Sequence, residues 1–200
     1  MSLDDIGGHT MKNNKSNQEA VRKLTLAGLL TALATALSFI KIPILGVSIT
    51  LVLPVVVIGA ALCGPLVGAW LTVIPNILAF SEAGLFLTYS PAGCVATLLL
   101  KGILAGLVAG VVYKALSKKH PIGAVTVSAI LAPIINSGVF ILGCYIFIWD
   151  QLVITAREKG VSIGLLVLGL GVLNGIIELM LNLILCPAIL RVIQIITKKK

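Results

Sequence analysis

The stretch Ile163–Arg191, IGLLVLGLGVLNGIIELMLNLILCPAILR, decides the fold of this chain. It is apolar except near its middle, where Asn174, Glu178 and Asn182 follow one another at intervals of four residues. On a helix, this spacing places the three polar side chains on one stripe. A carboxylate in hydrocarbon is costly unless it faces a partner or water. We therefore expect Glu178 to face the interior of a bundle of membrane helices.

The composition of the whole chain is that of an integral membrane protein. Of its 200 residues, 58% are hydrophobic and 11% are charged, whereas soluble domains carry about 25% charged residues. A bilayer core of about 30 Å takes roughly 20 helical residues to cross. The chain has five long runs without Asp, Glu, Lys or Arg, namely Leu24–Ile40, Ile42–Ser81, Ala83–Leu100, His120–Trp149 and Gly160–Ile177.

These runs predict an all-α fold, an integral membrane bundle of six transmembrane helices. The run from Ile42 to Ser81 is too long for one crossing, and Cys63-Gly64-Pro65 breaks it near its middle. The helices are expected at Val21–Ile40, Val47–Leu62, Pro65–Phe80, Pro91–Leu116, Ile122–Trp149 and Ile163–Arg191, with loops at Lys41–Gly46, Ser81–Ser90 and Asp150–Gly160 on the outer side.

The placement of the positive charges predicts that both termini are cytoplasmic. Eleven of the fifteen Lys and Arg residues then lie inside: four before or in the first turn of the first helix, three at 114–119 and four at the C-terminal end. The net charge of +8 is thus explained by membrane topology, and no nucleic-acid partner is expected. Residues 1–10 are interpreted as an expression scar before Met11, and residues 11–200 as a single six-helix membrane domain.

A second buried charge, Lys101, lies in the fourth predicted helix. Counted along the helices at 1.5 Å per residue, Lys101 lies about 15 Å and Asn174 about 20 Å from the outer side. Asn136 lies about 22 Å from the inner side, and Glu178 is a turn deeper than Asn174. These four residues are therefore expected to meet at one polar centre. The centre is either a polar ligand site or a structural pairing of Lys101 with Glu178, in which asparagines hold the helices together.

Aromatic and small residues add further candidates. Phe86 and Tyr89, in the outer loop that is predicted to fold back as a lid, and Phe140 are candidates for lining a ligand pocket. Small residues recur every four positions as Gly28, Ala32 and Ala36 in the first helix, and as Gly102, Gly106 and Gly110 in the fourth. Such faces let helix backbones approach closely. Packing inside the bundle is favoured for the fourth helix, whereas for the first helix internal packing and docking to a partner both remain open.

No catalytic residue, metal site or cofactor is predicted. The histidines are His9 and His120, no HExxH motif occurs, and no G-x-x-x-x-G-K-[ST] loop is available to hold ATP phosphates. The four cysteines share no metal-ligand spacing. A zinc protease or a self-contained ATPase is thereby disfavoured.

At this point the chain resembles the substrate-binding S component of energy-coupling factor (ECF) transporters, the vitamin-uptake systems of bacteria and archaea. The resemblance rests on the six predicted helices, on the A-x-x-x-A element Ala32–Ala36, on LLLKGILAGLVAGVVYKALSKK (98–119) and on NGIIELMLNLILCPAILRVI (174–193). It implies a high-affinity subunit of the cell membrane that binds a vitamin-like small molecule. It also implies a transmembrane T subunit and two cytoplasmic ATPases as partners, with Gly28, Ala32 and Ala36 docking on the T subunit. The S component would then reorient in the membrane to release its ligand.

The ligand and two other functions stay open at this stage. A buried Lys and Glu flanked by amides suit a small polar or zwitterionic molecule, which would be bound by Lys101, Asn136, Asn174 and Glu178. A stand-alone proton-coupled secondary transporter using Glu178 is the main alternative, although no inverted repeat is visible. An intramembrane enzyme is disfavoured, because only Lys101 with Glu178 offers acid or base chemistry.

Overall fold

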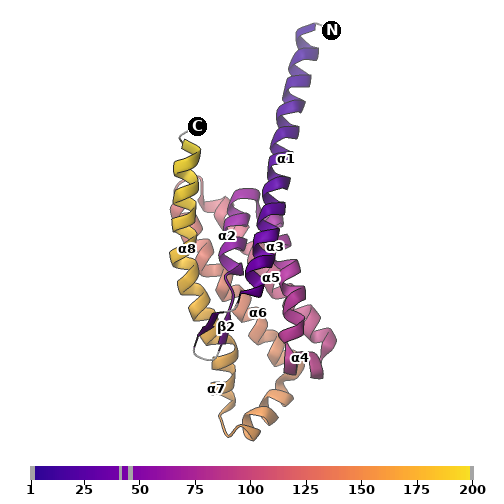
Figure 1. Ribbon diagram of the computed structural model, residues 1–200, viewed down its shortest axis with the longest axis vertical. Helices are drawn as coiled ribbons and strands as arrows, with labels where there is room; N and C mark the ends of the chain where they lie inside the picture. Colours follow the sequence, from indigo (N-terminus) through magenta and orange to yellow (C-terminus); the bar gives the residue numbers. More distant parts are fainter. Residues whose placement is uncertain (1–2, 41, 45–46, 199–200) are drawn as a thin grey trace.

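The computed structural model describes residues 3–40, 42–44 and 47–198, which form a bundle of helices with one small β-hairpin (Figure 1). A 3₁₀ turn (Ala79–Glu82) precedes α4, and a π-helical turn (Leu168–Val172) joins α7 to α8. The strands are β1 (Ile42–Ile44) and β2 (Val47–Ile49). The helices are α1 (Leu3–Phe39), α2 (Val52–Cys63), α3 (Pro65–Leu78), α4 (Gly84–Tyr89), α5 (Pro91–Leu116), α6 (Pro121–Glu158), α7 (Ile163–Val167) and α8 (Leu173–Lys198).

The helical fold predicted from the sequence is confirmed, and its long helices are apolar enough for a membrane protein. Within the described residues, four segments are long and apolar enough to cross a membrane: Ala20–Phe39, Pro91–Leu116, Pro121–Glu158 and Leu173–Arg191. The helices α2 and α3 are also apolar but have only 12 and 14 residues. They are about 18 and 21 Å long, shorter than the roughly 30 Å hydrocarbon core. The count of six crossings therefore stays a prediction.

The second predicted helix was placed too early. It begins at Val52 and not at Val47, because residues 42–44 and 47–49 pair as antiparallel strands, with Ile42 opposite Ile49 and Ile44 opposite Val47. The physical reason is visible in the sequence. β-branched residues alternate with Pro43 and Ser48, and this period of two is typical of a strand.

Two of the predicted outer loops are also corrected. Residues 81–90 contain the end of the 3₁₀ turn and α4, and residues 150–158 continue α6 beyond a kink at Ile148 (φ −138°, ψ 20°). Beyond the kink, Leu152 and Ala156 are almost fully buried, at intervals of four residues from Ile148. This apolar stripe keeps the segment helical despite its charges. The last predicted helix, Ile163–Arg191, is interrupted by the π-helical turn.

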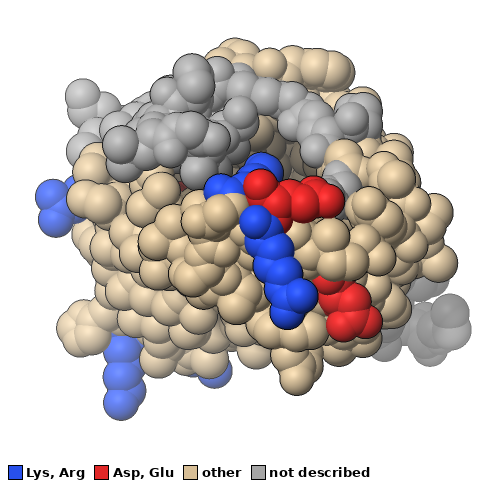
Figure 2. All heavy atoms as spheres, turned by 90° about the horizontal axis from the view of Figure 1, so that it is seen from below, with Lys and Arg blue, Asp and Glu red and all other residues tan. Residues whose placement is uncertain are grey.

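Both ends of the chain lie at the same end of the bundle, together with the turn between α5 and α6 (Figure 1). α4 and α7 lie at the opposite end. Seen from that end, basic and acidic side chains lie next to one another near the middle of the surface, with uncharged residues around them (Figure 2). α5 packs against α3 and α6, and α8 packs against α2 and α6. α5 and α6 are thus the centre of the bundle.

A tight turn explains why a space is left inside the bundle. Gly64 (φ 106°) joins α2 to α3, and Pro65 opens α3, where its missing N–H costs nothing. From this turn the two short helices run only part of the way toward the end that carries α4 and α7. Beyond the ends of α2 and α3, the packing of the helices leaves a space inside the bundle.

Candidate ligand-binding site

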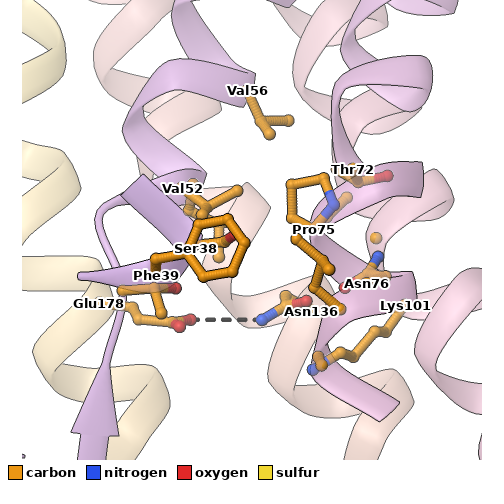
Figure 3. Close-up of a pocket in the computed structure, with 16 residues that line it drawn as sticks. Ser38, Phe39, Val52, Val56, Thr72, Pro75, Asn76, Lys101, Asn136 and Glu178 are labelled. Atoms are coloured by element: carbon orange, nitrogen blue, oxygen red, sulfur yellow. Dashed lines mark hydrogen bonds between the residues drawn. The ribbon is translucent and has the colours of Figure 1, made fainter. Parts of the chain in front are cut away.

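A cavity of about 190 Å³ lies at the ends of α2 and α3 that are remote from Gly64. It is enclosed by α1, α2, α3, α5, α6 and α8 (Figure 3). Its lining residues are Ser38, Phe39, Thr50, Val52, Leu53, Val56, Thr72, Pro75, Asn76, Leu78, Ala79, Lys101, Gly102, Ala105, Asn136 and Glu178. Ligand pockets for drug-sized molecules measure about 300–1,000 Å³, so this cavity suits a smaller molecule.

One wall of the cavity is acidic. Glu178 on α8 is only 6% exposed, and its Oε2 accepts a hydrogen bond of 3.3 Å from Nδ2 of Asn136 on α6 (Figure 3). Hydrogen bonding is what makes a buried carboxylate tolerable. A single bond to one oxygen leaves further acceptor capacity, because a carboxylate has about four lone-pair sites. Glu178 can therefore accept a donor from a molecule in the cavity.

The stripe predicted on α8 continues toward the C-terminus from Glu178, where its next residue forms hydrogen bonds within the helix. Asn182 is fully buried, and its Nδ2 donates to the backbone carbonyl of Glu178 at 2.9 Å. Its Oδ1 accepts from Sγ of Cys186 at 3.4 Å. Asn182 thus fixes α8 around Glu178 and does not line the cavity. Asn174, one turn before Glu178 in α8, does not line the cavity either, and its buried Oδ1 has no hydrogen-bond partner.

The facing wall is basic. Lys101 on α5 lines the same cavity as Glu178, yet no carboxylate within 4.0 Å pairs with it among the described residues. Its ammonium lies 5.1 Å from the centre of the Phe140 ring, a cation–π contact. A contact of this kind orients the lysine without neutralising it. The direct pairing of Lys101 with Glu178, one of the two interpretations of the sequence, is thus not formed in the structure.

Two polar residues of the cavity, Asn76 and Thr72 on α3, were missed by the sequence analysis. Nδ2 of Asn76 is buried and has no hydrogen-bond partner. Both side chains lie against Gly102, where a Cβ atom would collide with them. This close approach of α3 to α5 places Asn76 near Lys101 (Figure 3). The sequence did contain a signal for Asn76, because it is an amide within the uncharged run 42–81, directly after Pro75. Asn136 lies in a similar setting and was recognised.

A comparison with protein families adds to this geometry. A family model described as "ECF transporter, substrate-specific component" matches residues 22–190. The chain belongs to this family. The match spans every wall of the cavity, so the chain is a substrate-specific membrane subunit of an ECF transporter, an S component. Neither the comparison with curated proteins nor that with solved structures gave a match.

The three aromatic candidates lie at different distances from the cavity of this S component. Phe140 contacts Lys101, and Phe86 packs edge-on against Phe140 with ring centroids 6.3 Å apart. Phe86 is buried and joins α4 to α5 and α6 through a cluster with Cys94 and Leu98. Tyr89 is 54% exposed and does not line the cavity. The first two therefore support the basic wall from behind.

The two faces of small residues differ sharply in the S component. Gly106 and Gly110 of α5 lie against the backbone of α3 at Gly68 and Pro65. Packing inside the bundle, the interpretation favoured for this face, is what the structure shows. On α1, by contrast, Gly28, Ala32 and Ala36 are exposed, and a Cβ at Gly28 would meet nothing within 4 Å. The face of α1 thus does not serve internal packing.

Proposed function

We propose that this S component captures a small water-soluble, vitamin-like nutrient in the cavity between Lys101 and Glu178. The observation that carries the proposal is that these two residues face one cavity without pairing directly. Ionisable groups are costly inside a membrane and usually mark substrate pathways. A purely structural pair would be expected to close on itself. An open arrangement leaves both groups available to a ligand.

The proposed orientation places both termini in the cytoplasm. The basic residues near the chain ends and in the α5–α6 turn favour this side. The cavity lies toward the ends of α2 and α3 that point away from the Gly64 turn, and therefore nearer the outer face. A nutrient arriving from outside would reach it past the hairpin and α4.

For transport, we propose that the exposed face of α1, formed by Gly28, Ala32 and Ala36, docks on a transmembrane T subunit. Small residues allow a partner helix to approach closely, and Gly28, Ala32 and Ala36 remain exposed within the part of the chain that the structure describes. ATP hydrolysis is assigned to two cytoplasmic ATPases, since the sequence contains no P-loop. The S component would then reorient and release the nutrient inside. It binds its substrate and does not convert it.

The test is a thermal-shift screen of the detergent-purified protein against water-soluble vitamins and their precursors. A ligand that binds only the folded state raises the unfolding temperature by mass action. The proposal expects one compound to raise it by several degrees, and expects Glu178→Gln and Lys101→Met to reduce that shift. Lys114→Gln, at the exposed end of the same helix as Lys101, serves as the matched control. A hit whose shift is unchanged in both cavity variants would contradict the proposed site.

Uptake by whole cells separates this function from the stand-alone transporter. An S component should accumulate the nutrient only when the T subunit and the ATPases are co-expressed. Uptake by this chain alone, abolished by a protonophore, would instead favour a stand-alone secondary transporter, in which Glu178 is the candidate proton carrier.

A further inference from the structure

The two walls of the cavity have opposite hydrogen-bonding character. On the wall formed by α3 and α5, Lys101 carries three N–H donors and Asn76 presents a buried N–H₂ group without an acceptor. On the opposite wall, the carboxylate of Glu178 can only accept. One of its oxygens is engaged by Asn136, and no other hydrogen bond to this carboxylate is formed within the described residues. The cavity thus has one end built for an acceptor and one end built for a donor.

Charge balance further restricts the class of ligand that the cavity can bind. Lys101 and Glu178 contribute one positive and one negative charge, so the ligand-free cavity is formally neutral. Net charge inside a membrane is costly, and a ligand without net charge leaves the total unchanged. A molecule that carries only an anion would satisfy Lys101 but would place an additional negative charge in the cavity with Glu178. A molecule that carries only a cation would satisfy Glu178 but would place an additional positive charge in the cavity with Lys101.

The two donors on the wall formed by α3 and α5 are held in place by their neighbours. Oγ1 of Thr72 donates its proton to the carbonyl of Ala69 at 2.7 Å, so Thr72 adds no donor to this wall. Lys101 is held in place by the ring of Phe140, and the amide of Asn76 is confined by Gly102. The donors of this wall are therefore oriented before a ligand arrives, which lowers the cost of binding.

We propose that the substrate is a small zwitterion, whose anionic group is bound by Lys101 and Asn76 and whose cationic group is bound by Glu178. This inference rests on the proposed function, because it names the class of nutrient bound at the same site. With a cavity of about 190 Å³, the class is that of amino acids and of small heterocycles carrying a carboxylate and a protonated nitrogen.

The experiment compares matched triplets of probes on the purified full chain. Each triplet contains a zwitterion, its carboxamide, which keeps only the cation, and its deamino acid, which keeps only the anion. The probes are the common α-amino acids, β-alanine, 4-aminobutyrate and pyridine-based amino acids, added to the vitamin panel. Loss of one member of a buried charge pair typically weakens binding by about 100-fold. The zwitterion of one triplet should therefore bind about 100-fold more tightly than its two analogues.

The ratio of affinities for two probes, measured on the same variant, does not depend on how much of that variant is folded. Glu178→Gln should cancel the preference for the zwitterion over the deamino acid, whereas Lys101→Gln should cancel the preference over the carboxamide. Asn76→Ala should weaken binding of the zwitterion and the deamino acid by about tenfold, the effect of one hydrogen bond to a charged group. It should weaken binding of the carboxamide by less, because the carboxamide offers only a neutral carbonyl oxygen to Asn76. Glu158→Gln and Lys114→Gln, both at exposed positions, are the controls.

The outcomes separate the two proposals. A vitamin without a zwitterionic form that binds tightly, and loses affinity in Lys101→Gln and Glu178→Gln, would overturn the zwitterion while leaving the proposed function intact. Equal selectivity in wild type and in both charge variants would also overturn it. If no compound of either panel binds, and cells with the complete transporter take up none of them, both proposals fall.

Discussion

The small-residue faces of α5 and α1 have the same spacing but opposite surroundings. Gly102, Gly106 and Gly110 are enclosed, and a Cβ atom at any of them would collide with α3 or with the turn before it. Gly28, Ala32 and Ala36 point away from the bundle. The same helix α1 buries Ala34 completely, against α2 and α3. α1 is therefore packed on one side and open on the other.

This contrast shows that a small-residue pattern identifies a close helix contact without saying which helix makes it. On α5 the contact is made within the chain, because Gly68 on α3 matches Gly106. On α1 no described residue of the chain covers the pattern at Gly28. Because the chain belongs to the S-component family, we propose the open face of α1 as the docking surface for a T subunit.

The largest expected effect concerns stability. Gly106→Ala places a methyl group against the backbone of Gly68 and Ala69, which cannot move aside as a flexible side chain would. We expect a loss of about 3 kcal/mol or more in the free energy of unfolding, at the upper end of overpacking effects. Gly28→Ala is the matched control and should be neutral or stabilising by about 0.5–1 kcal/mol, since alanine favours a helix. Equal losses in the two variants, measured by denaturant unfolding in detergent, would show that both faces are internal.

The second expected effect concerns transport. Replacing Ala32 and Ala36 with leucine should block close approach of the T subunit, and reduce nutrient uptake by co-expressing cells by about tenfold or more, equivalent to about 1.4 kcal/mol of lost association. Ligand affinity and thermal stability of the isolated S component should stay at the wild-type level, because both side chains are exposed. Co-purification with the T subunit measures the association directly. A parallel loss of ligand binding would assign this face to internal packing.

A smaller effect tests the same contrast between two asparagines. Asn182 uses its amide within the fold, whereas the Nδ2 group of Asn76 is unused. Asn182→Ala should lower the free energy of unfolding by about 2 kcal/mol, because it removes two buried hydrogen bonds. Asn76→Ala should cost less than about 1 kcal/mol in the ligand-free protein, since no hydrogen bond is lost. The reverse order would mean that Asn76 is a structural residue.

Much of the fold could be predicted because hydrophobic length dominates membrane helices. The bounds Pro91–Leu116 agree with the structure, since prolines and a basic end mark them clearly. The hairpin at 42–49 was missed because it lies within a continuous uncharged run. The helical end of α6 was missed because its charges suggested a loop, whereas Leu152 and Ala156 anchor it. The six crossings, their orientation and the interpretation of residues 1–10 stay predictions.

The candidate site was accessible from the sequence only in part. Depth along each helix put Lys101, Asn136 and Glu178 in one layer, and the structure places all three on one cavity. Depth does not give the rotation of a helix about its axis, so Asn174 was included although it faces elsewhere. The same limit hid Asn76 and Thr72, whose position depends on the close contact of α3 with Gly102. The role of these residues in binding stays a prediction.

The most direct test of the account is the affinity of wild type and Lys101→Met for the ligand found in the screen, measured by titration calorimetry together with ligand-free stability. The account predicts a loss of affinity of about 100-fold. It also predicts an unfolding temperature that is unchanged or raised without ligand, because methionine removes a charge that has no ion-pair partner among the described residues. Unchanged affinity, or a large loss of ligand-free stability, would show that Lys101 serves the fold and that the cavity is not the binding site.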